Sequence, residues 1–170
     1  MSRPADVLRA GCEILDSVLV PHGFHFALRE AAKSCGGHFA WGEYIRGDRR
    51  LALHFQWSLG LVTYHLGDVQ VAHEPYVRTV HGVSGENAYP GFSDDPLDGF
   101  RHLRHDLEQY GSAFLRGTDE ELQSLLLRAV EEVQRRPRGR KALFDLDAVN
   151  QARSRAVLTD PLPPGFGLSH

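Results

Sequence analysis

Cysteine is almost absent from this chain: Cys12 and Cys35 are the only two among 170 residues. Two such residues do not make the disulfide framework of a small secreted domain, and their scarcity is typical of a reducing compartment. The first residues, Met1–Asp6, lack the apolar core of a signal peptide, and no run approaches the roughly 20 apolar residues that a membrane span requires. We therefore expect a cytoplasmic protein with no membrane partner.

An excess of charge of one sign is also lacking. The formal net charge is -3, so the chain has no global basic field that would attract nucleic acid. The run Arg135–Lys141 carries five positive side chains in seven positions, but it contains no aromatic residue that could stack on bases. It also follows a predicted helix end, where cations are favourable in any case. We therefore do not expect a nucleic-acid partner.

Motifs for catalysis and metal binding are missing as well. The chain has ten histidines but no His-Glu-x-x-His, no cysteine pair two residues apart and no glycine-rich phosphate loop. We therefore predict no catalytic residue, no metal and no cofactor. The alternative is a small hydrolase or metal-binding enzyme that uses the strand histidines His54 and His65. Glu43 or Cys35 would complete such a site.

The stretch from Leu51 to His73 is the centre of the predicted fold. Apolar and polar residues alternate in its first part, and we expect these apolar residues to face the core: Leu51, Leu53, Phe55, Trp57 and Leu59. A period of two is typical of a strand with one buried face. Gly67-Asp68 stands between two further apolar runs and fits a two-residue hairpin turn. The sequence therefore predicts an antiparallel sheet.

Other elements surround this stretch. Further strands are expected at Phe24–Leu28, His38–Arg46 and, as a short edge segment, Pro75–Val80. Apolar residues at helical spacing predict a helix from Pro4 to about Val20, one helix along Leu97–Phe114, and a third that begins at a Thr118/Glu121 capping box.

The order of these elements predicts an α+β fold: an antiparallel sheet of about four to five strands flanked by an N-terminal helix and two C-terminal helices. We expect a single domain over residues 1–158, with a short final helix at 147–158. Residues 159–170 read as an extended Pro/Gly-rich tail.

Glu43 stands among apolar residues in the strand His38–Arg46. Phe39, Trp41 and Ile45 share its face, so either Glu43 is an inner-face carboxylate or Gly42 marks a bulge that shifts the register. The bulge is the favoured interpretation, because an unpaired buried carboxylate is costly.

A binding surface is the remaining functional feature. His54 and Gln56 lie on the polar side of the central strand, and His65 is expected across the sheet from His54. The long polar loop 81–95 contains Tyr89 and Phe92, and aromatic residues of this kind dominate interface hot spots. Trp41 and Trp57 are expected to be core residues.

Three segments, Ser58–Tyr64, His73-Glu74 and Tyr89–Leu97, give the chain a resemblance to uncharacterised bacterial domains. In element order it is similar to small immunity-type proteins encoded beside polymorphic toxins, over most of residues 5–133. This resemblance implies a cytoplasmic α+β protein that binds and blocks one partner and catalyses nothing. Many immunity proteins are strongly acidic, and the present chain departs from that pattern.

The sequence therefore favours a non-enzymatic protein-binding module, immunity-like in character, with a protein partner. Its contact surface would comprise Tyr89 and Phe92 as anchors and His54, Gln56 and His65 as polar contacts. A homodimer formed through an exposed strand edge is a further alternative.

Overall fold

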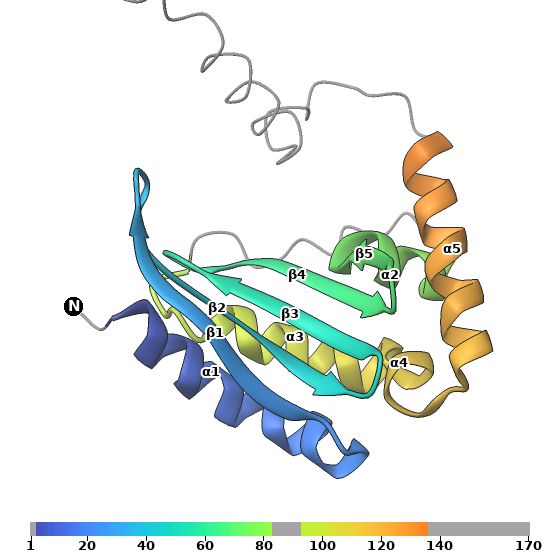
Figure 1. Ribbon diagram of the computed structural model, residues 1–170, viewed down its shortest axis with the longest axis horizontal. Coiled ribbons are helices and arrows are strands. Elements are labelled where there is room, and N and C mark those ends of the chain that lie inside the picture. Colours follow the sequence, from blue (N-terminus) through green and yellow to red (C-terminus); the bar gives the residue numbers. More distant parts are fainter. Residues whose placement is uncertain (1–2, 83–92, 136–170) are drawn as a thin grey trace, which may run out of the picture. The chain divides into compact units, whose positions relative to one another are not determined.

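The structure of the chain is a computed structural model that describes residues 3–82 and 93–135 (Figure 1). The helices are α1 (Pro4–Leu19), α2 (His73–His81), α3 (Asp98–Tyr110), α4 (Ser112–Arg116) and α5 (Asp119–Arg135), and a 3-10 turn at Val20–His22 follows α1. The strands are β1 (His25–Ser34), β2 (Gly37–Arg46), β3 (Arg49–Phe55), β4 (Leu59–Leu66) and β5 (Val69–Ala72).

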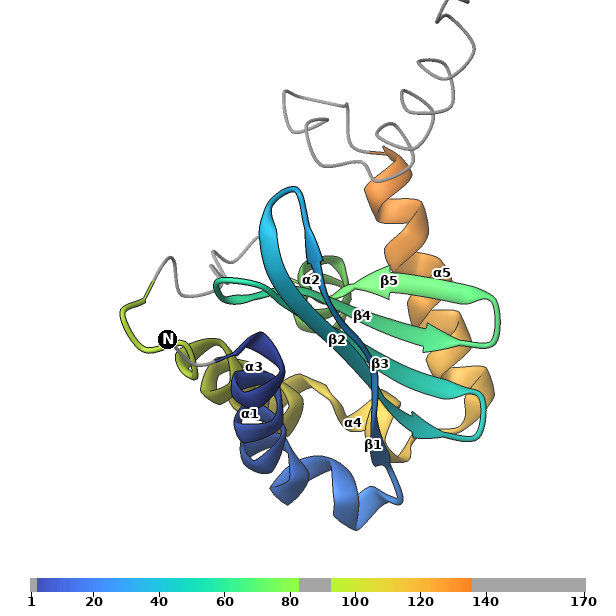
Figure 2. The same cartoon turned by 60° about the vertical axis from the view of Figure 1, so that its left-hand side comes forward.

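The five strands form one antiparallel sheet in the order β1-β2-β3-β4-β5, so every strand pairs with its neighbour in the chain. Figure 2 shows this succession across the sheet. Leu66 pairs with Val69 around the Gly67-Asp68 turn, and Gly67 has a φ of 55°, which confirms the expected two-residue hairpin. The predicted α+β class is confirmed, with five strands in the sheet.

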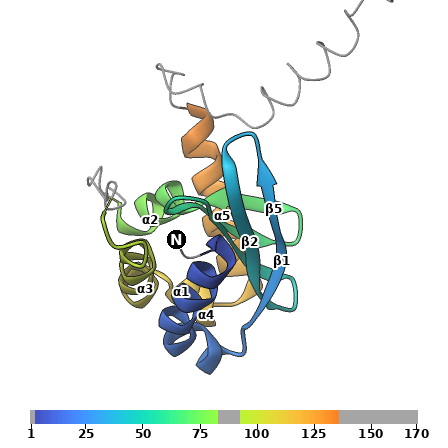
Figure 3. The ribbon, with the colours of Figure 1, turned by 90° about the vertical axis from the view of Figure 1, so that its left-hand side faces the viewer.

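The helices pack against one face of the sheet, which we call the covered face (Figure 3). Helix α1 contacts β2 and α3, whereas α2 and α5 contact β4 and β5. The sheet residues buried on this side include Ala40, Tyr44, Leu51, Leu53, Phe55, Leu59, Val62, Tyr64 and Val71. They join the apolar residues of the helices in one core, because alternate strand positions point to the same face.

Polar anchors tie the helices to this face. The Tyr44 hydroxyl of β2 lies 2.8 Å from the Cys12 carbonyl and 2.7 Å from Asp16 Oδ1, both in α1. Arg49, at the start of β3, donates to the Phe114 carbonyl at 2.8 Å and to Asp119 Oδ1 at 2.6 Å. Such charge-assisted bonds satisfy carbonyls at the end of α4 and so hold the helix connection on the sheet.

Glycine permits two close approaches. A Cβ at Gly11 would lie 2.5 Å from the Phe100 ring, so α1 and α3 can pack this closely only because residue 11 has no side chain. A Cβ at Gly111 would lie 2.4 Å from the Leu107 carbonyl oxygen. The chain turns at Gly111 and divides into α3 and α4. The prediction of a single helix along Leu97–Phe114 is therefore wrong.

Two other expectations about local structure are wrong. Strand β3 ends at Phe55, and the chain reverses at residues 56–58, where the Gln56 amide donates to the Ser58 carbonyl. Trp57 is therefore 64% exposed rather than in the core. The segment Pro75–Val80 lies in α2, because proline is tolerated in the first turn of a helix, where its missing amide has no intrahelical partner.

The capping box of α5 is confirmed: the Thr118 amide donates to Glu121 at 2.9 Å, and the Glu121 amide donates to the Thr118 hydroxyl at 3.2 Å. The predicted helix at 147–158 and the tail at 159–170 lie outside the described residues, so the domain limits stay a prediction. Within the described ranges no helix has the length and apolar character needed to cross a membrane.

Candidate protein-binding face

The second face of the sheet is covered by no helix among the described residues, and we call it the open face. It is defined by Phe39, Trp41, Glu43 and Ile45 of β2, Arg50, Ala52 and His54 of β3, and Leu61, Thr63 and His65 of β4. The register arranges most of these residues in rows across the strands. The three rows are Trp41-His54-Leu61, Glu43-Ala52-Thr63 and Ile45-Arg50-His65.

The placement of Phe39, Trp41 and Ile45 corrects the expectation that they face the core. The covered face of β2 carries Ala40, Gly42 and Tyr44 instead. Trp41 is only partly buried and its indole nitrogen lies 3.4 Å from Glu30 Oε2. The largest apolar side chains of this strand are therefore available on the open face.

Glu43 is a buried carboxylate in the middle row, with 5% of the residue exposed. Arg29 Nε donates to Glu43 Oε2 at 2.8 Å, and Arg50 Nη1 donates to Oε1 at 3.4 Å. The two arginine side chains are 43% and 38% exposed, whereas the Glu43 side chain is 7% exposed. The carboxylate is thus neutralised from both sides, and solvent meets two guanidinium groups above it.

A bulge in β1 brings Arg29 to this carboxylate. The pairing of β1 with β2 shifts between Leu28 and Glu30, so Arg29 is the extra residue opposite Gly42 and Trp41. The expected bulge at Gly42 is therefore wrong, because the pairing of β2 with β3 runs without a shift through Gly42 and Glu43. The irregularity lies on the neighbouring strand and supplies a partner for Glu43.

Aromatic and apolar side chains gather at the end of the open face that carries the Trp41-His54-Leu61 row. The rings of Phe39 and His54 stack with centroids 5.4 Å apart. Leu61, which pairs with His54 in the register, is 53% exposed. Trp57 follows β3 in the turn at this end, and its ring lies against Gly37 of β2. Large exposed apolar groups close together are typical of contact surfaces.

The structure places three of the predicted contact residues in this region. His54 and His65 share the open face, but they do not lie across from each other, because His54 pairs with Leu61 and His65 pairs with Arg50. Gln56 lies just beyond β3 and its side-chain nitrogen donates to the Gly36 carbonyl at 2.6 Å. Tyr89 and Phe92 lie outside the described residues.

The two histidines are biased towards their neutral forms. Burial lowers the pKa of His54 below its ordinary value. Burial also lowers the pKa of His65, and the nearby positive charge of Arg50 adds to this effect. At neutral pH both rings therefore present uncharged hydrogen-bonding groups, and the exposed positive charge at this face comes from Arg29 and Arg50.

Sequence reasoning missed a series of buried hydrogen bonds on the covered face. The Tyr64 hydroxyl lies 3.0 Å from His73 Nδ1, and His73 Nε2 lies 2.8 Å from Asp106 Oδ2. His73 closes the stretch Leu51–His73, which is predicted to form strands, but it begins α2. The helical spacing of His73, Tyr76 and Val77, all buried, is the signal that could have found this helix.

This chain of contacts links β4, α2 and α3. Burial opposes the charge of Asp106, but the hydrogen bond from His73 and further positive partners outweigh it and lower the pKa of the carboxyl. Tyr64 is 1% exposed and His73 is 5% exposed. Because substrate cannot reach such groups, the arrangement supports packing of the helices on the sheet.

The enzyme alternative gains no assembled site in the described part of the chain. Within residues 3–82 and 93–135, no group of three or more His, Cys, Asp or Glu side chains is arranged so that it could hold a metal ion. Glu43 is engaged by its arginines, and Cys35 is exposed in the turn between β1 and β2. Burial raises the pKa of Cys12 to about 12, which disfavours a reactive thiolate.

The edge strand β1 bears on the homodimer alternative. It is ten residues long and pairs only with β2 among the described strands. Its bulge at Arg29 and its charged residues Glu30 and Lys33 are features that discourage pairing between sheet edges. The homodimer stays a prediction, and this edge does not favour it.

Comparisons of the chain with protein-family models, with curated proteins and with solved structures give no match. The functional argument therefore depends on the geometry of the open face.

Proposed function

We propose that the chain is a non-enzymatic protein-binding module of the cytoplasm and that the open face contacts its partner. The observation that supports this is that exposed apolar side chains and accessible guanidinium groups occur together on the open face. Leu61 and Trp57 are 53% and 64% exposed, respectively. Burial of such groups against a partner is favourable, because it removes apolar surface from water.

The charge of the face specifies the chemistry of the partner. Arg29 and Arg50 cover Glu43 and leave their own outer surfaces in solvent. A partner that places a carboxylate over these two guanidinium groups and apolar side chains over Trp41 and Leu61 would be complementary to the face. An acidic and apolar protein surface is therefore the proposed target, and blocking such a surface is how an immunity-like protein would act.

A capture experiment with matched variants tests the proposal. Tagged protein is expressed in the native host, and its bound proteins are quantified by mass spectrometry. Leu61→Lys places a charge on the open face, whereas Leu127→Lys makes the same change at a 45% exposed leucine of α5. We expect one stoichiometric partner with the parent chain and with Leu127→Lys, and its loss with Leu61→Lys.

Equal recovery with both variants, at equal thermal stability, would contradict the assignment of the open face. The electrostatic part is tested separately with Arg50→Glu, which reverses an accessible charge and should weaken capture of an acidic partner. Tyr89 and Phe92 remain proposed anchors, and unchanged capture by Tyr89→Ala would remove Tyr89 from the contact surface.

A further inference from the structure

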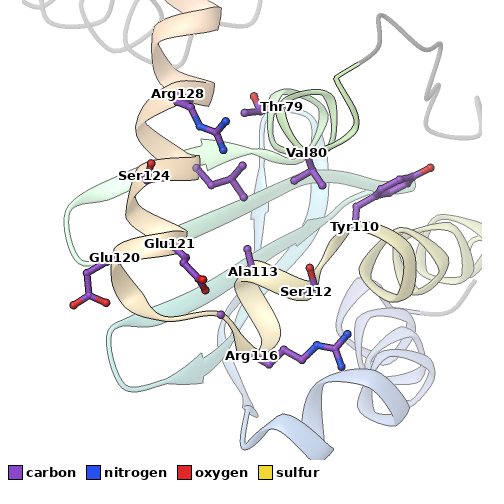
Figure 4. A pocket seen from close by; sticks show the side chains of 12 residues that line it. Thr79, Val80, Tyr110, Ser112, Ala113, Arg116, Glu120, Glu121, Ser124 and Arg128 are labelled. Atoms are coloured by element: carbon purple, nitrogen blue, oxygen red, sulfur yellow. The ribbon is translucent and has the colours of Figure 1, made fainter.

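A pocket lies on the helical side of the molecule, away from the open face. It is bordered by α2, by the residues from the end of α3 through α4, and by α5 (Figure 4). Its volume is about 840 Å³, which falls within the range of roughly 300–1,000 Å³ that is usual for small-molecule sites. The binding proposal for the open face makes no use of it.

Serine and arginine occur in two matching pairs along its walls. Ser124 and Arg128 line the pocket from α5, and Ser112 and Arg116 line it from α4. Within each pair the residues are four positions apart, so each hydroxyl and its arginine share one side of a helix. A hydroxyl beside a guanidinium is a suitable donor pair for an oxyanion.

These donors have no partner in the described part of the chain. The helix arginines Arg78 and Arg104 pair with glutamates four residues away. Neither Arg116 nor Arg128 has an ion pair or a hydrogen bond within residues 3–82 and 93–135, and the same holds for the hydroxyls of Ser112 and Ser124. Their hydrogen-bonding capacity is therefore available to a ligand.

Apolar side chains separate the two pairs. Val80 of α2 and Leu125 of α5 line the pocket together with Ala113, and Val80 is 37% exposed. Figure 4 shows Val80 projecting from α2 towards the space between the helices. A ligand that fits this lining needs an apolar body as well as an anionic head.

The two ends of the pocket differ in the number of carboxylates near them. Glu120 and Glu121 lie in the first turn of α5, near the end lined by Gly117. The Glu121 carboxylate already accepts the Thr118 amide. In Figure 4, Arg128 reaches from α5 towards α2 at the opposite end. Near Arg128, the Glu132 carboxylate accepts from the Thr79 hydroxyl at 3.3 Å. An anionic head therefore meets two carboxylates at the Gly117 end but one, engaged by Thr79, at the Arg128 end, so it is favoured beside Arg128 and Ser124.

We propose that this pocket binds a small amphipathic ligand with an oxyanion head, a carboxylate or a phosphate monoester. Ser124 and Arg128 hold the head, and the apolar body lies along Val80 and Leu125. Arg116, at the end that carries Glu120 and Glu121, contributes less to the affinity.

Titration of the full ¹⁵N-labelled chain, followed by amide chemical shifts, tests the proposal. The probes are decanoate, decyl phosphate, decanol and inorganic phosphate, each below the concentration at which it forms micelles. We expect decanoate or decyl phosphate to shift amides around Val80, Ser124 and Arg128 with saturation. The stronger of the two identifies the source of the oxyanion, whereas decanol and inorganic phosphate should bind at least tenfold more weakly.

Variants locate the head. Arg128→Ala should weaken binding of the better probe by about tenfold or more, because a charge-assisted contact is lost. Arg116→Ala should weaken it less, and Arg104→Ala, an exposed arginine of α3 that pairs with Glu108, should leave it unchanged. Absence of saturable shifts, equal binding of decanol, or a larger effect of Arg116→Ala than of Arg128→Ala would overturn the proposal.

Discussion

The two faces of the sheet use the same strands for different purposes. In β3 the residues Leu51 and Leu53 are at most 1% exposed on the covered face, whereas Arg50 and His54, which flank them, are partly exposed on the open face. The covered face excludes water by packing against helices. The open face contains a buried charge as well, but this charge is satisfied by arginines that remain in contact with solvent.

This difference shows where each kind of polar group can be tolerated. Asp106 and His73 are compatible with the covered side because they bond to each other and to Tyr64. Glu43 is compatible with the open side because Arg29 and Arg50 neutralise it without losing their own hydration completely. Stability therefore depends mainly on the covered face, and the open face retains groups that a partner can reach.

The largest expected effect comes from a change on the covered face. Leu51→Ala should lower the free energy of unfolding by about 2–5 kcal/mol, because it removes buried methyl groups and leaves a cavity. His54→Ala, three positions along the same strand but on the open face, should cost about 1 kcal/mol or less. Chemical denaturation of both variants measures the difference, and similar losses would contradict the contrast between the faces.

Removal of the buried charge on the open face should have an intermediate effect. Glu43→Gln leaves Arg29 and Arg50 without their carboxylate, and we expect a loss of about 1–3 kcal/mol in the free energy of unfolding. This is less than for a fully buried ion pair, because both arginines are more than a third exposed and solvent screens them.

Glu30→Gln is the matched control for Glu43→Gln, because Glu30 is exposed and its carboxylate lies 3.4 Å from the Trp41 indole nitrogen, with no arginine bonded to it among the described residues. It should change the free energy of unfolding by less than about 0.5 kcal/mol. If both variants were equally stable, the Glu43 cluster would have no structural role.

Acid should act on the two faces in separate pH ranges. The folded pKa of Asp106 lies below the ordinary value of 3.8, so its contribution to stability is present above that pH and is lost as the pH falls below it. The folded pKa values of His54 and His65 lie below 6.5. Their protonation favours the unfolded chain, so stability should already decline as the pH falls below about 6.5.

Variants separate these two ranges in measurements of unfolding against pH. Asp106→Asn should flatten the loss of stability below about pH 3.8, relative to its own stability at neutral pH. His54→Ala should reduce the slope just below about pH 6.5 and leave the acidic limb in place. An unchanged acidic limb in Asp106→Asn would show that other carboxyls control it.

The sequence predicted the elements of the fold where the signal is local. Alternation in Leu51–Phe55, glycine at the Gly67-Asp68 turn and the Thr118/Glu121 capping box each depend on residues a few positions apart. Such patterns reflect backbone geometry and can be read without knowledge of tertiary contacts. The α+β class followed from their order.

The choice of face in β2 could not be predicted in the same way. The more apolar set, with Phe39 and Trp41, lies on the open face, and the smaller set faces the helices. A Cβ at Gly42 would lie 2.5 Å from the Phe26 ring, so small residues are needed there for a long-range reason. Periodicity shows that a strand has two faces, but the neighbouring elements decide which one is buried.

The partners of the candidate site were beyond sequence reasoning for the same reason. Arg29 meets Glu43 through a bulge on a different strand, and His73 meets Asp106 across 33 positions of the chain. The sequence predicts a short edge segment at Pro75–Val80, whereas Pro75 lies in the first turn of α2. Contacts between distant segments determine these features, and single-chain patterns do not contain them.

A small effect on stability is also expected at Trp57, although its side chain is among the largest. Trp57→Ser should change the free energy of unfolding by less than about 0.5 kcal/mol, because the ring is 64% exposed and lies against Gly37. The same change should weaken partner capture if the apolar end of the open face is a contact surface. A loss above about 2 kcal/mol would instead place Trp57 in the core, as simple alternation along Leu51–Leu59 had predicted.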